Sequence, residues 1–482
     1  MFLFLYLIFV LLASILGYFY VGEGMNLWYM SLCAFAMCGA SILFCVTMRH
    51  EQKAWGFFSA SSLFSLGFWI VHFFYASLLV VYEDIQHERG LWLFPDLGNY
   101  SMLVAVIAFS LFYVGYLSLG KTQPRMVMRS ITVPSQRSLS KMLLFTPLLS
   151  MVNFAMFIAV VGPTYLSGAY AGSANWDTGA TYYFQFFELF YYLTLILEVY
   201  KIRLIKRHLN VFQYVLSFNW LTLGFLVVFT LFNLYIGDRG PVIAAICILV
   251  GGYDLFIKRF NFILVVCALV VGIMSMSYIS NYRTRDAGAS FEERVEDAKY
   301  KLAEKHWYHA PGELGSNVRT LAAGIAFAES EGHWKGKFQG VHILGMVPFA
   351  KRVVLYVFRI PFGLTSSGYL TIMINGGRGV GVGTTPVADV YLDFGIFGVI
   401  VMFPVLGRFM AWLELNVFSS ESVYIFVVYL WLQSNALYWP RAVFLHNINE
   451  IVWALFILWL VQKSLLRSHE KKEMVLARPF LG

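Results

Sequence analysis

Long apolar runs alternate with short polar connections over most of the chain. Most runs reach the roughly 20 residues that an α-helix needs to cross the hydrocarbon core of a bilayer, and none has the alternation of a membrane β-strand. The pattern predicts an all-α polytopic integral membrane protein with about 12 transmembrane helices. The predicted spans are residues 2–20, 26–47, 55–81, 99–119, 142–161, 181–200, 211–236, 241–257, 260–279, 387–407, 421–440 and 449–466.

One polar region interrupts this pattern between the ninth and tenth predicted spans. Residues 281–386 mix charged residues, Gly and His, and their spacing favours short helices. Within them, the apolar stretch 341–359 is broken by Pro348, which is typical of a re-entrant segment enclosed by protein or water. The chain therefore divides into spans 1–9 (residues 1–280), one large external loop (281–386), and spans 10–12 with a tail (387–482).

The distribution of Lys and Arg predicts which side of the membrane each connection faces. One set of connections, together with the C-terminal tail, carries most of these residues, whereas the short loops on the other side carry only Arg89, Arg239 and Arg441. Because positive charge is retained on the cytoplasmic side, both termini are predicted to be cytoplasmic and the large loop periplasmic.

The composition agrees with this assignment. Apolar residues make up 59% of the chain and charged residues only 13%, and the mean hydropathy is +0.68, which excludes an ordinary soluble domain. The net charge of +8 follows from the basic cytoplasmic connections, so no nucleic-acid partner is predicted. All five cysteines fall inside predicted spans, which argues against a disulfide framework.

Four arginines near the predicted outer boundary could bind an anionic ligand. Arg239 lies in a tight Gly-rich connection between two spans, where a guanidinium can bind phosphate bidentately. It could equally extend to the interface and pair with the neighbouring Asp238. Arg378 lies in a glycine-rich loop that could approach an anion or simply carry a charge. Arg319 and Arg352 add positive charge to the same loop region.

Acid–base candidates also cluster near the external end of the tenth span. Asp389 and Asp393 are spaced i, i+4 and share one helix face. They could interact with the helix dipole, or Asp389 could act as a general base, a role open also to His342. His306 and His309 lack a third ligand at suitable spacing, so neither a metal site nor a cofactor is predicted.

The architecture and two local patterns resemble the Wzy-type oligosaccharide repeat-unit polymerases, which make O-antigen and related surface polysaccharides. Residues 237–240 (Gly-Asp-Arg-Gly) resemble the Gly-x-Arg-Gly turn that follows a mid-chain span in that family. Residues 385–398 resemble its loop-to-helix stretch. Two departures are Asp389, where Glu or another polar residue is common, and Asp393, where Asn is common.

The resemblance implies a metal-independent glycosyltransferase of the bacterial inner membrane that joins undecaprenyl-diphosphate-linked repeat units at the periplasmic face. A hydroxyl of the acceptor glycan would attack the anomeric carbon of the donor and expel the lipid diphosphate. A chain-length regulator protein is left open as a further partner. The implied diphosphate ligands are Arg239 and Arg378, with Arg319 or Arg352 assisting, and the implied proton acceptor is Asp389 or His342.

Two other functions fit the same pattern. An O-antigen ligase, or another lipid-dependent membrane glycosyltransferase, could use Glu83 and Asp84 as its external acidic pair. A transporter or flippase would also have about twelve spans, but such carriers are generally built from two related halves. Here the long connection follows the ninth predicted span and does not divide the chain into two halves, which favours the glycosyltransferase hypothesis.

Overall fold

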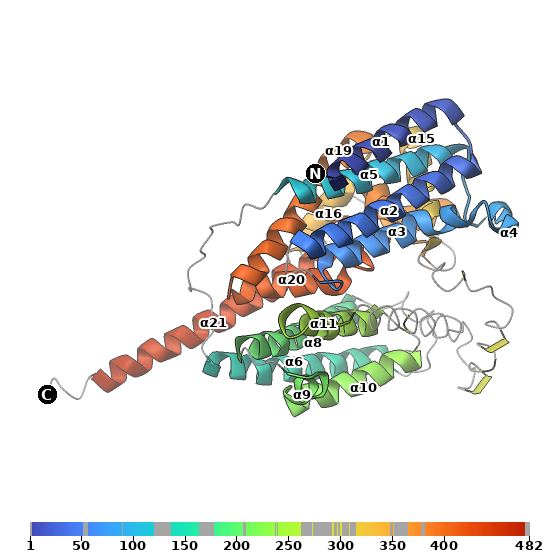
Figure 1. The fold of residues 1–482 in the computed structure, drawn as a ribbon. Helices are drawn as coiled ribbons and strands as arrows, with labels where there is room; N and C mark the ends of the chain where they lie inside the picture. The colour runs from blue at the N-terminus through green and yellow to red at the C-terminus, as the bar shows by residue number, and fades with distance from the viewer. Residues whose placement is uncertain are drawn as a thin grey trace.

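The computed structural model describes most of the chain as helices. The described residues are 2–51, 56–88, 90–119, 136–162, 178–205, 209–236, 238, 240–261, 315–347, 350, 365–376 and 381–477, with isolated positions between 272 and 308. Every regular element within these ranges is a helix (Figure 1).

The helices form two bundles joined by a central pair (Figure 1). The first bundle contains α1 (Phe2–Val21), α2 (Leu27–Glu51), α3 (Ala60–Leu78), α5 (Gly98–Ser118) and α19 (Pro386–Ser419). The second contains α6 (Gln136–Val161), α8 (Thr178–Ile205), α10 (Trp220–Ile236) and α11 (Gly240–Phe256). Between them lie α20 (Val423–Asn435) and α21 (Ile448–Ala477), and α21 projects beyond the body of the protein.

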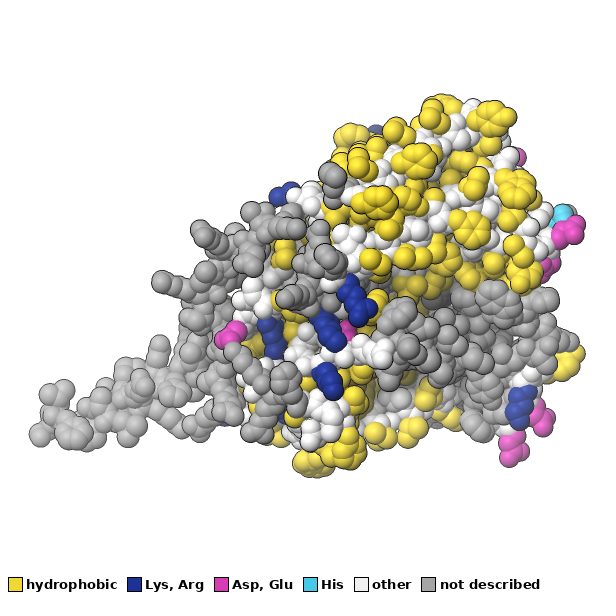
Figure 2. Space-filling view, in the orientation of Figure 1, with side chains coloured by type: hydrophobic (Ala, Val, Ile, Leu, Met, Phe, Trp, Pro, Cys, Tyr) yellow, Lys and Arg dark blue, Asp and Glu magenta, His cyan; other side chains and the backbone are white. Residues whose placement is uncertain are grey.

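Hydropathy and length mark several of the described helices as candidate membrane spans. Six of them are long and apolar enough to cross a bilayer, and α10, α11 and α20 are shorter apolar helices. Apolar side chains cover much of the outer surface of the first bundle (Figure 2), as expected for residues in contact with lipid. The polytopic membrane architecture is thus supported. The predicted span 260–279 lies almost wholly outside the described residues, so the total of 12 stays a prediction.

One predicted span is broken in the structure. Residues 211–236 form a short helix, α9 (Val211–Leu216), followed by α10. The carboxylate of Glu198 in α8 accepts a hydrogen bond from the backbone N–H of Asn219 (2.9 Å) just before α10 begins. A carboxylate at this position satisfies a free helix N–H and interacts favourably with the dipole, which explains why α10 starts there.

The connections collect at two opposite ends of the protein. At one end, the backbone N–H of Asn99 donates to the carbonyl oxygen of Gly24 (2.8 Å), joining two loops predicted to be external. At the other end, the Arg203 guanidinium donates to the carbonyl oxygens of Val417 (2.7 Å) and Ser420 (3.0 Å), joining two connections predicted to be cytoplasmic. Each of these contacts joins connections that the Lys and Arg distribution predicts to lie on the same side of the membrane.

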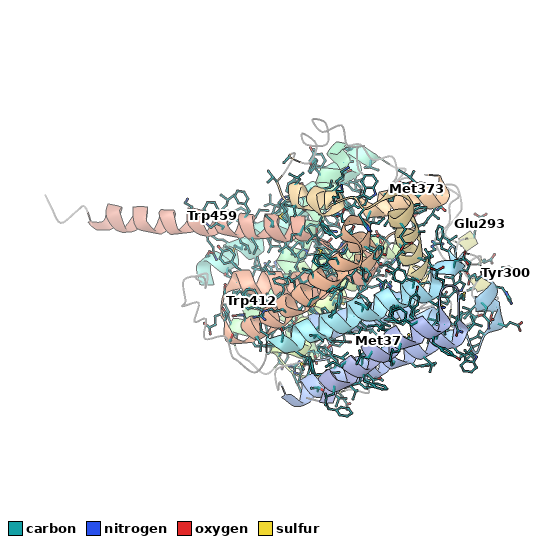
Figure 3. All side chains as sticks on the ribbon, turned by 90° about the horizontal axis from the view of Figure 1, so that it is seen from above. Met37, Glu293, Tyr300, Met373, Trp412 and Trp459 are labelled. Atoms are coloured by element: carbon teal, nitrogen blue, oxygen red, sulfur yellow. The ribbon has the colours of Figure 1, made fainter. Side chains whose placement is uncertain are left out.

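The large loop belongs to the first of these ends. Its short helices include α15 (Val318–Glu331) and α18 (Ser366–Asn375). Viewed from above, Glu293, Tyr300 and Met373 lie at the end opposite to Trp412 and Trp459 (Figure 3). In Figure 2, most visible Lys and Arg side chains lie toward the end from which α21 projects.

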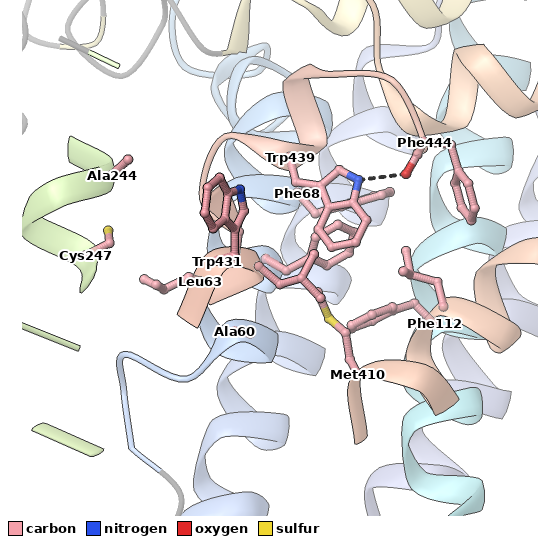
Figure 4. Close-up of a cluster of buried hydrophobic side chains, with 14 of the residues drawn as sticks. Ala60, Leu63, Phe68, Phe112, Ala244, Cys247, Met410, Trp431, Trp439 and Phe444 are labelled. Atoms are coloured by element: carbon pink, nitrogen blue, oxygen red, sulfur yellow. Dashed lines mark hydrogen bonds between the residues drawn. The ribbon is translucent and has the colours of Figure 1, made fainter. Parts of the chain in front are cut away.

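Side chains of α20 and the segment after it fill the space between the bundles (Figure 4). Trp431 and Trp439 are almost fully buried there, and the indole N–H of Trp439 donates to the carbonyl oxygen of Phe444 (2.9 Å). The amide of Gln433 donates to the carbonyl oxygens of Phe58 (3.1 Å) and Cys247 (2.9 Å). These contacts fix α20 to both bundles and define where the chain after it must lie.

Glycines allow α5 and α19 to pack backbone to backbone. A Cβ atom at Gly115 would lie 2.0 Å from the carbonyl oxygen of Pro404, and one at Gly407 would lie 2.0 Å from that of Phe112. Small residues at such contacts are typical of close helix packing in membranes. This pair of helices is the rigid support for the external segment described below.

Replacement of Gly407 by Leu should therefore separate α5 from α19. Overpacking of this kind costs about 1–3 kcal/mol, so the thermal midpoint of the detergent-purified protein should fall by several degrees. Gly224→Leu is the matched control, because Gly224 is exposed and no heavy atom lies within 4 Å of a Cβ built there. Equal midpoints for Gly407→Leu and Gly224→Leu would contradict the packing argument.

Candidate functional site

A break in α19 shapes the external end of the protein. Gly395 has φ 65° and ψ −160°, a conformation that is essentially restricted to glycine. The backbone N–H groups of Trp334 and Lys335 donate to the carbonyl oxygens of Leu392 and Asp393 (2.9 Å each). The break therefore lets residues 334–335 of the large loop hydrogen-bond to the backbone of the first turns of α19.

Asp393 anchors a second element of the loop. Its carboxylate accepts the backbone N–H groups of Phe338 (3.2 Å) and Gln339 (2.9 Å) in the first turn of α16 (Lys337–Gly345). A carboxylate at a helix N-terminus is stabilised by the free N–H groups and the dipole. The Asp393 carboxylate therefore stabilises the N-terminus of α16, whereas the sequence predicted an interaction with the dipole of its own helix.

Asp389 joins the same helix to the segment that follows α20. Its Oδ2 atom accepts hydrogen bonds from the side-chain amide of Gln339 (2.6 Å) and from the backbone N–H of Phe444 (2.8 Å). The Asp389 side chain is fully buried. One carboxylate oxygen thus holds the connection 436–447 against α16.

The other end of α16 rests on α21. The indole N–H of Trp453 donates to the carbonyl oxygen of Met346 (2.8 Å), immediately after α16. His342, in the last turn of α16, is near enough to His446 to influence it electrostatically. Burial, and to a smaller extent His342, lower the pKa of His446 to about 4, so its imidazole is neutral at pH 7.

A polar cavity lies where the second bundle meets α20 and α21. Its volume is about 500 Å³, which is within the usual range for small-molecule sites. It is lined by Phe184, Glu188, Tyr192, Asp238, Gly240, Pro241, Ala244, Trp431, Ser434, Asn435, Tyr438, Arg441, Ala442, His446, Asn447 and Glu450.

Ionisable groups are concentrated in this cavity. Three carboxylates line it, from Glu188 in α8, Asp238 before α11 and Glu450 in α21, together with the Arg441 guanidinium and His446. Glu188 interacts electrostatically with both other carboxylates. Ionisable groups among membrane helices are costly to bury and therefore point to function. The described residues of the cavity can offer hydrogen-bond acceptors to hydroxyl groups, and the Arg441 guanidinium can offer a positive charge to an anion.

The residues predicted from the sequence fall in different places. His342 influences the lining residue His446 electrostatically, and Asp389 accepts a hydrogen bond from the backbone of Phe444, two residues before His446. Arg319 lies elsewhere: its guanidinium donates to the carbonyl oxygen of Gly90 (3.3 Å). Burial lowers the pKa of Arg319, and the nearby Glu88 opposes this shift.

Three predicted diphosphate ligands, Arg239, Arg352 and Arg378, lie outside the described residues. The residues on either side of position 239, Asp238 and Gly240, both line the cavity. The described residues flanking position 378 do not line it.

Three cavity residues, Glu188, Arg441 and Glu450, are not among the site residues predicted from the sequence. Two of them could have been identified as candidates, because Glu188 and Glu450 are ionisable residues inside predicted apolar spans. Arg441 was one of only three basic residues in the short external loops. Among the described residues, no group of three or more His, Cys, Asp or Glu side chains is suited to hold a metal ion.

A pair of variants separates positioning from catalysis at Asp389. In Asp389→Asn, the amide oxygen can accept both hydrogen bonds that Oδ2 accepts, whereas Asp389→Ala removes both. If the side chain acts by positioning the 436–447 connection, Asn should keep the enzymatic rate that the resemblance implies within about tenfold, and Ala should lose more. Should Asn be as inactive as Ala with a wild-type melting midpoint, Asp389 would be the general base predicted from the sequence.

Comparison with protein families agrees with the resemblance noted in the sequence. A family model described as O-antigen polysaccharide polymerase Wzy matches residues 2–471. No curated protein and no solved structure matches the chain. The matched range includes both helix bundles, the large loop and every residue that lines the cavity. The chain therefore belongs to the O-antigen polysaccharide polymerase Wzy family.

Proposed function

We propose that this protein joins undecaprenyl-diphosphate-linked repeat units into O-antigen or a related surface polysaccharide, at the periplasmic face of the bacterial inner membrane. Family membership supports repeat-unit polymerisation. The observation that carries the proposal is the cavity of charged and amide side chains within an apolar helix bundle, at the same end as the large loop. A chain-length regulator stays a predicted partner, on family grounds alone.

The proposed reaction transfers a glycan from one lipid diphosphate to a sugar hydroxyl. The hydroxyl oxygen of the acceptor bonds to the anomeric carbon of the donor, and the bond from that carbon to the diphosphate oxygen breaks. The hydroxyl proton passes to a base, and the lipid diphosphate leaves with the bonding electrons. The protein must therefore stabilise a growing negative charge on one side and accept a proton on the other.

Arg441 is the proposed ligand of the leaving diphosphate. Its guanidinium stays protonated at any relevant pH and can donate two parallel hydrogen bonds to phosphate oxygens. Arg239 joins it in this proposal, because the residues on either side of it line the same cavity. The roles predicted for Arg378 and Arg352 stay predictions. Arg319 hydrogen-bonds Gly90 instead, which argues against direct assistance.

Glu188 and Glu450 are the proposed partners of the acceptor sugar. Carboxylate oxygens accept hydrogen bonds from sugar hydroxyls, and one of the two can take the proton of the attacking hydroxyl. Among the described residues, the Oε2 atom of Glu450 is buried without a hydrogen-bond partner. The neutral His446 imidazole next to them can orient a hydroxyl without adding charge. In this proposal, Asp389 and His342 position the connection 436–447, part of which lines the cavity.

A ligase would use the same donor chemistry with a different acceptor, and a transporter would form no bond. Purified protein in liposomes, supplied with lipid-linked repeat units and no ion gradient, distinguishes all three. A ladder of longer glycans on the lipid diphosphate supports polymerisation. Transfer that requires a lipid A core acceptor would indicate a ligase, and unchanged glycans would indicate transport.

Loss of the Arg441 charge should strongly reduce elongation in this assay. Removing one charge-assisted contact to the leaving group lowers the rate by roughly 100-fold, so Arg441→Ala should yield only short chains. Arg441→Lys should be intermediate, since it keeps the charge but not the bidentate geometry. Arg319→Ala is the matched control and should make chains of normal length. Normal chains from Arg441→Ala, at equal protein abundance, would remove Arg441 from the mechanism.

Neutral isosteres test the two glutamates. Glu188→Gln and Glu450→Gln keep the size of each side chain but cannot accept a proton. Loss of a general base lowers the rate by roughly 10²–10⁴-fold, so one of the two variants should fall by this amount in single-turnover elongation. The other should mainly weaken acceptor binding. If both variants elongate at the wild-type rate, the proton acceptor lies outside the cavity.

A further inference from the structure

A second cavity lies between α2 and α3, far along the sequence from the residues of the polar cavity. Its volume is about 530 Å³. It is lined by Cys38, Ser41, Ile42, Cys45, Val46 and Arg49 of α2, by Phe57 and Phe58 of the following turn, and by Ser62, Leu63, Ser65, Leu66 and Trp69 of α3. We refer to it as the α2–α3 groove.

The surface of this groove is apolar. The Ser41 hydroxyl donates to the carbonyl oxygen of Met37 (2.9 Å) and accepts from the Tyr113 hydroxyl (3.0 Å), and the Ser65 hydroxyl donates to the carbonyl oxygen of Ser61 (2.7 Å), so both hydroxyl groups have partners within the protein. The groove also opens sideways from the bundle, since 59% of Ile42 and 60% of Val46 is exposed. In a membrane, these side chains face the hydrocarbon. A ligand of the groove must therefore be apolar along most of its length.

The length of the groove matches one leaflet. Cys38 and Arg49 mark its two ends on α2, and their separation of eleven residues corresponds to ~16 Å along a helix. Half of the hydrocarbon core of a bilayer is ~15 Å. The groove therefore extends from headgroup depth to about the middle of the membrane, which suits one acyl chain.

A positive charge lies at the headgroup end. Arg49 is exposed, and its guanidinium lies 5.0 Å from the centre of the Phe57 ring. Among the described residues, no carboxylate pairs with Arg49, whereas the nearby Arg259 pairs with Asp254 (3.3 Å). A guanidinium held on a ring at this depth is available to a phosphate oxygen.

We propose that the α2–α3 groove binds one anionic phospholipid of the leaflet in which Arg49 lies. One acyl chain fills the groove, and the phosphate binds Arg49. The bound lipid links α2 to α3 along the half of the membrane where they enclose the groove. This site is independent of the polar cavity and of the proposed reaction.

Native mass spectrometry of the full-length protein tests the proposal with phosphatidylglycerol and phosphatidylcholine of identical acyl chains as probes. Wild-type protein should retain one phosphatidylglycerol and little phosphatidylcholine. Arg49→Ala should lower phosphatidylglycerol retention roughly tenfold. Arg408→Ala, at another exposed basic residue predicted to face the same side, should leave it unchanged.

A second variant keeps Arg49 and obstructs the groove. Val46→Trp should lower phosphatidylglycerol retention as much as Arg49→Ala, whereas Leu32→Trp should not, because Leu32 is exposed on α2 outside the groove. Equal retention of the two lipids, or wild-type retention by both Arg49→Ala and Val46→Trp, would overturn the proposal. So would displacement of phosphatidylglycerol by an equimolar polyprenyl phosphate.

Discussion

The glycine break in α19 is the constraint on which the external end of the protein depends. In a continuous helix, the carbonyl groups of Leu392 and Asp393 would accept hydrogen bonds from the next turn of the same helix. They would then be unavailable to the backbone of the large loop. With the break at Gly395, those carbonyls accept the backbone of residues 334–335, and the Asp393 carboxylate accepts the start of α16. The membrane helix α19 thus positions the short helices of the large loop.

Two sets of hydrogen bonds connect α19 to the segments that line the polar cavity. Asp389 fixes α16 to the backbone of Phe444, and α16 fixes itself to α21 through Met346 and Trp453. The connection 436–447, which carries Arg441 and His446, is therefore held from both sides. In an apolar bundle, such polar contacts are strong because water does not compete for them. This arrangement suits a site that must hold a charged leaving group at headgroup depth.

That several helices are long and apolar enough to cross a membrane could be predicted from the sequence, because hydropathy responds directly to the bilayer. The break between α9 and α10 could not, since it depends on Glu198 from another helix. The cavity was missed for a related reason. Glu188, Arg441 and Glu450 come from distant spans, and only their packing against α20 brings them together. Asp389 could be selected from the sequence as a candidate, but its hydrogen-bonding partners could not, because they lie about 50 residues away in either direction.

The most direct test of the account is an experimental structure of the protein with a non-hydrolysable lipid-diphosphate-linked repeat unit. The account predicts phosphate oxygens within hydrogen-bonding distance of the Arg441 guanidinium, with the sugar directed toward Glu188 and Glu450. A diphosphate bound instead beside Arg319 and Glu88 would contradict it.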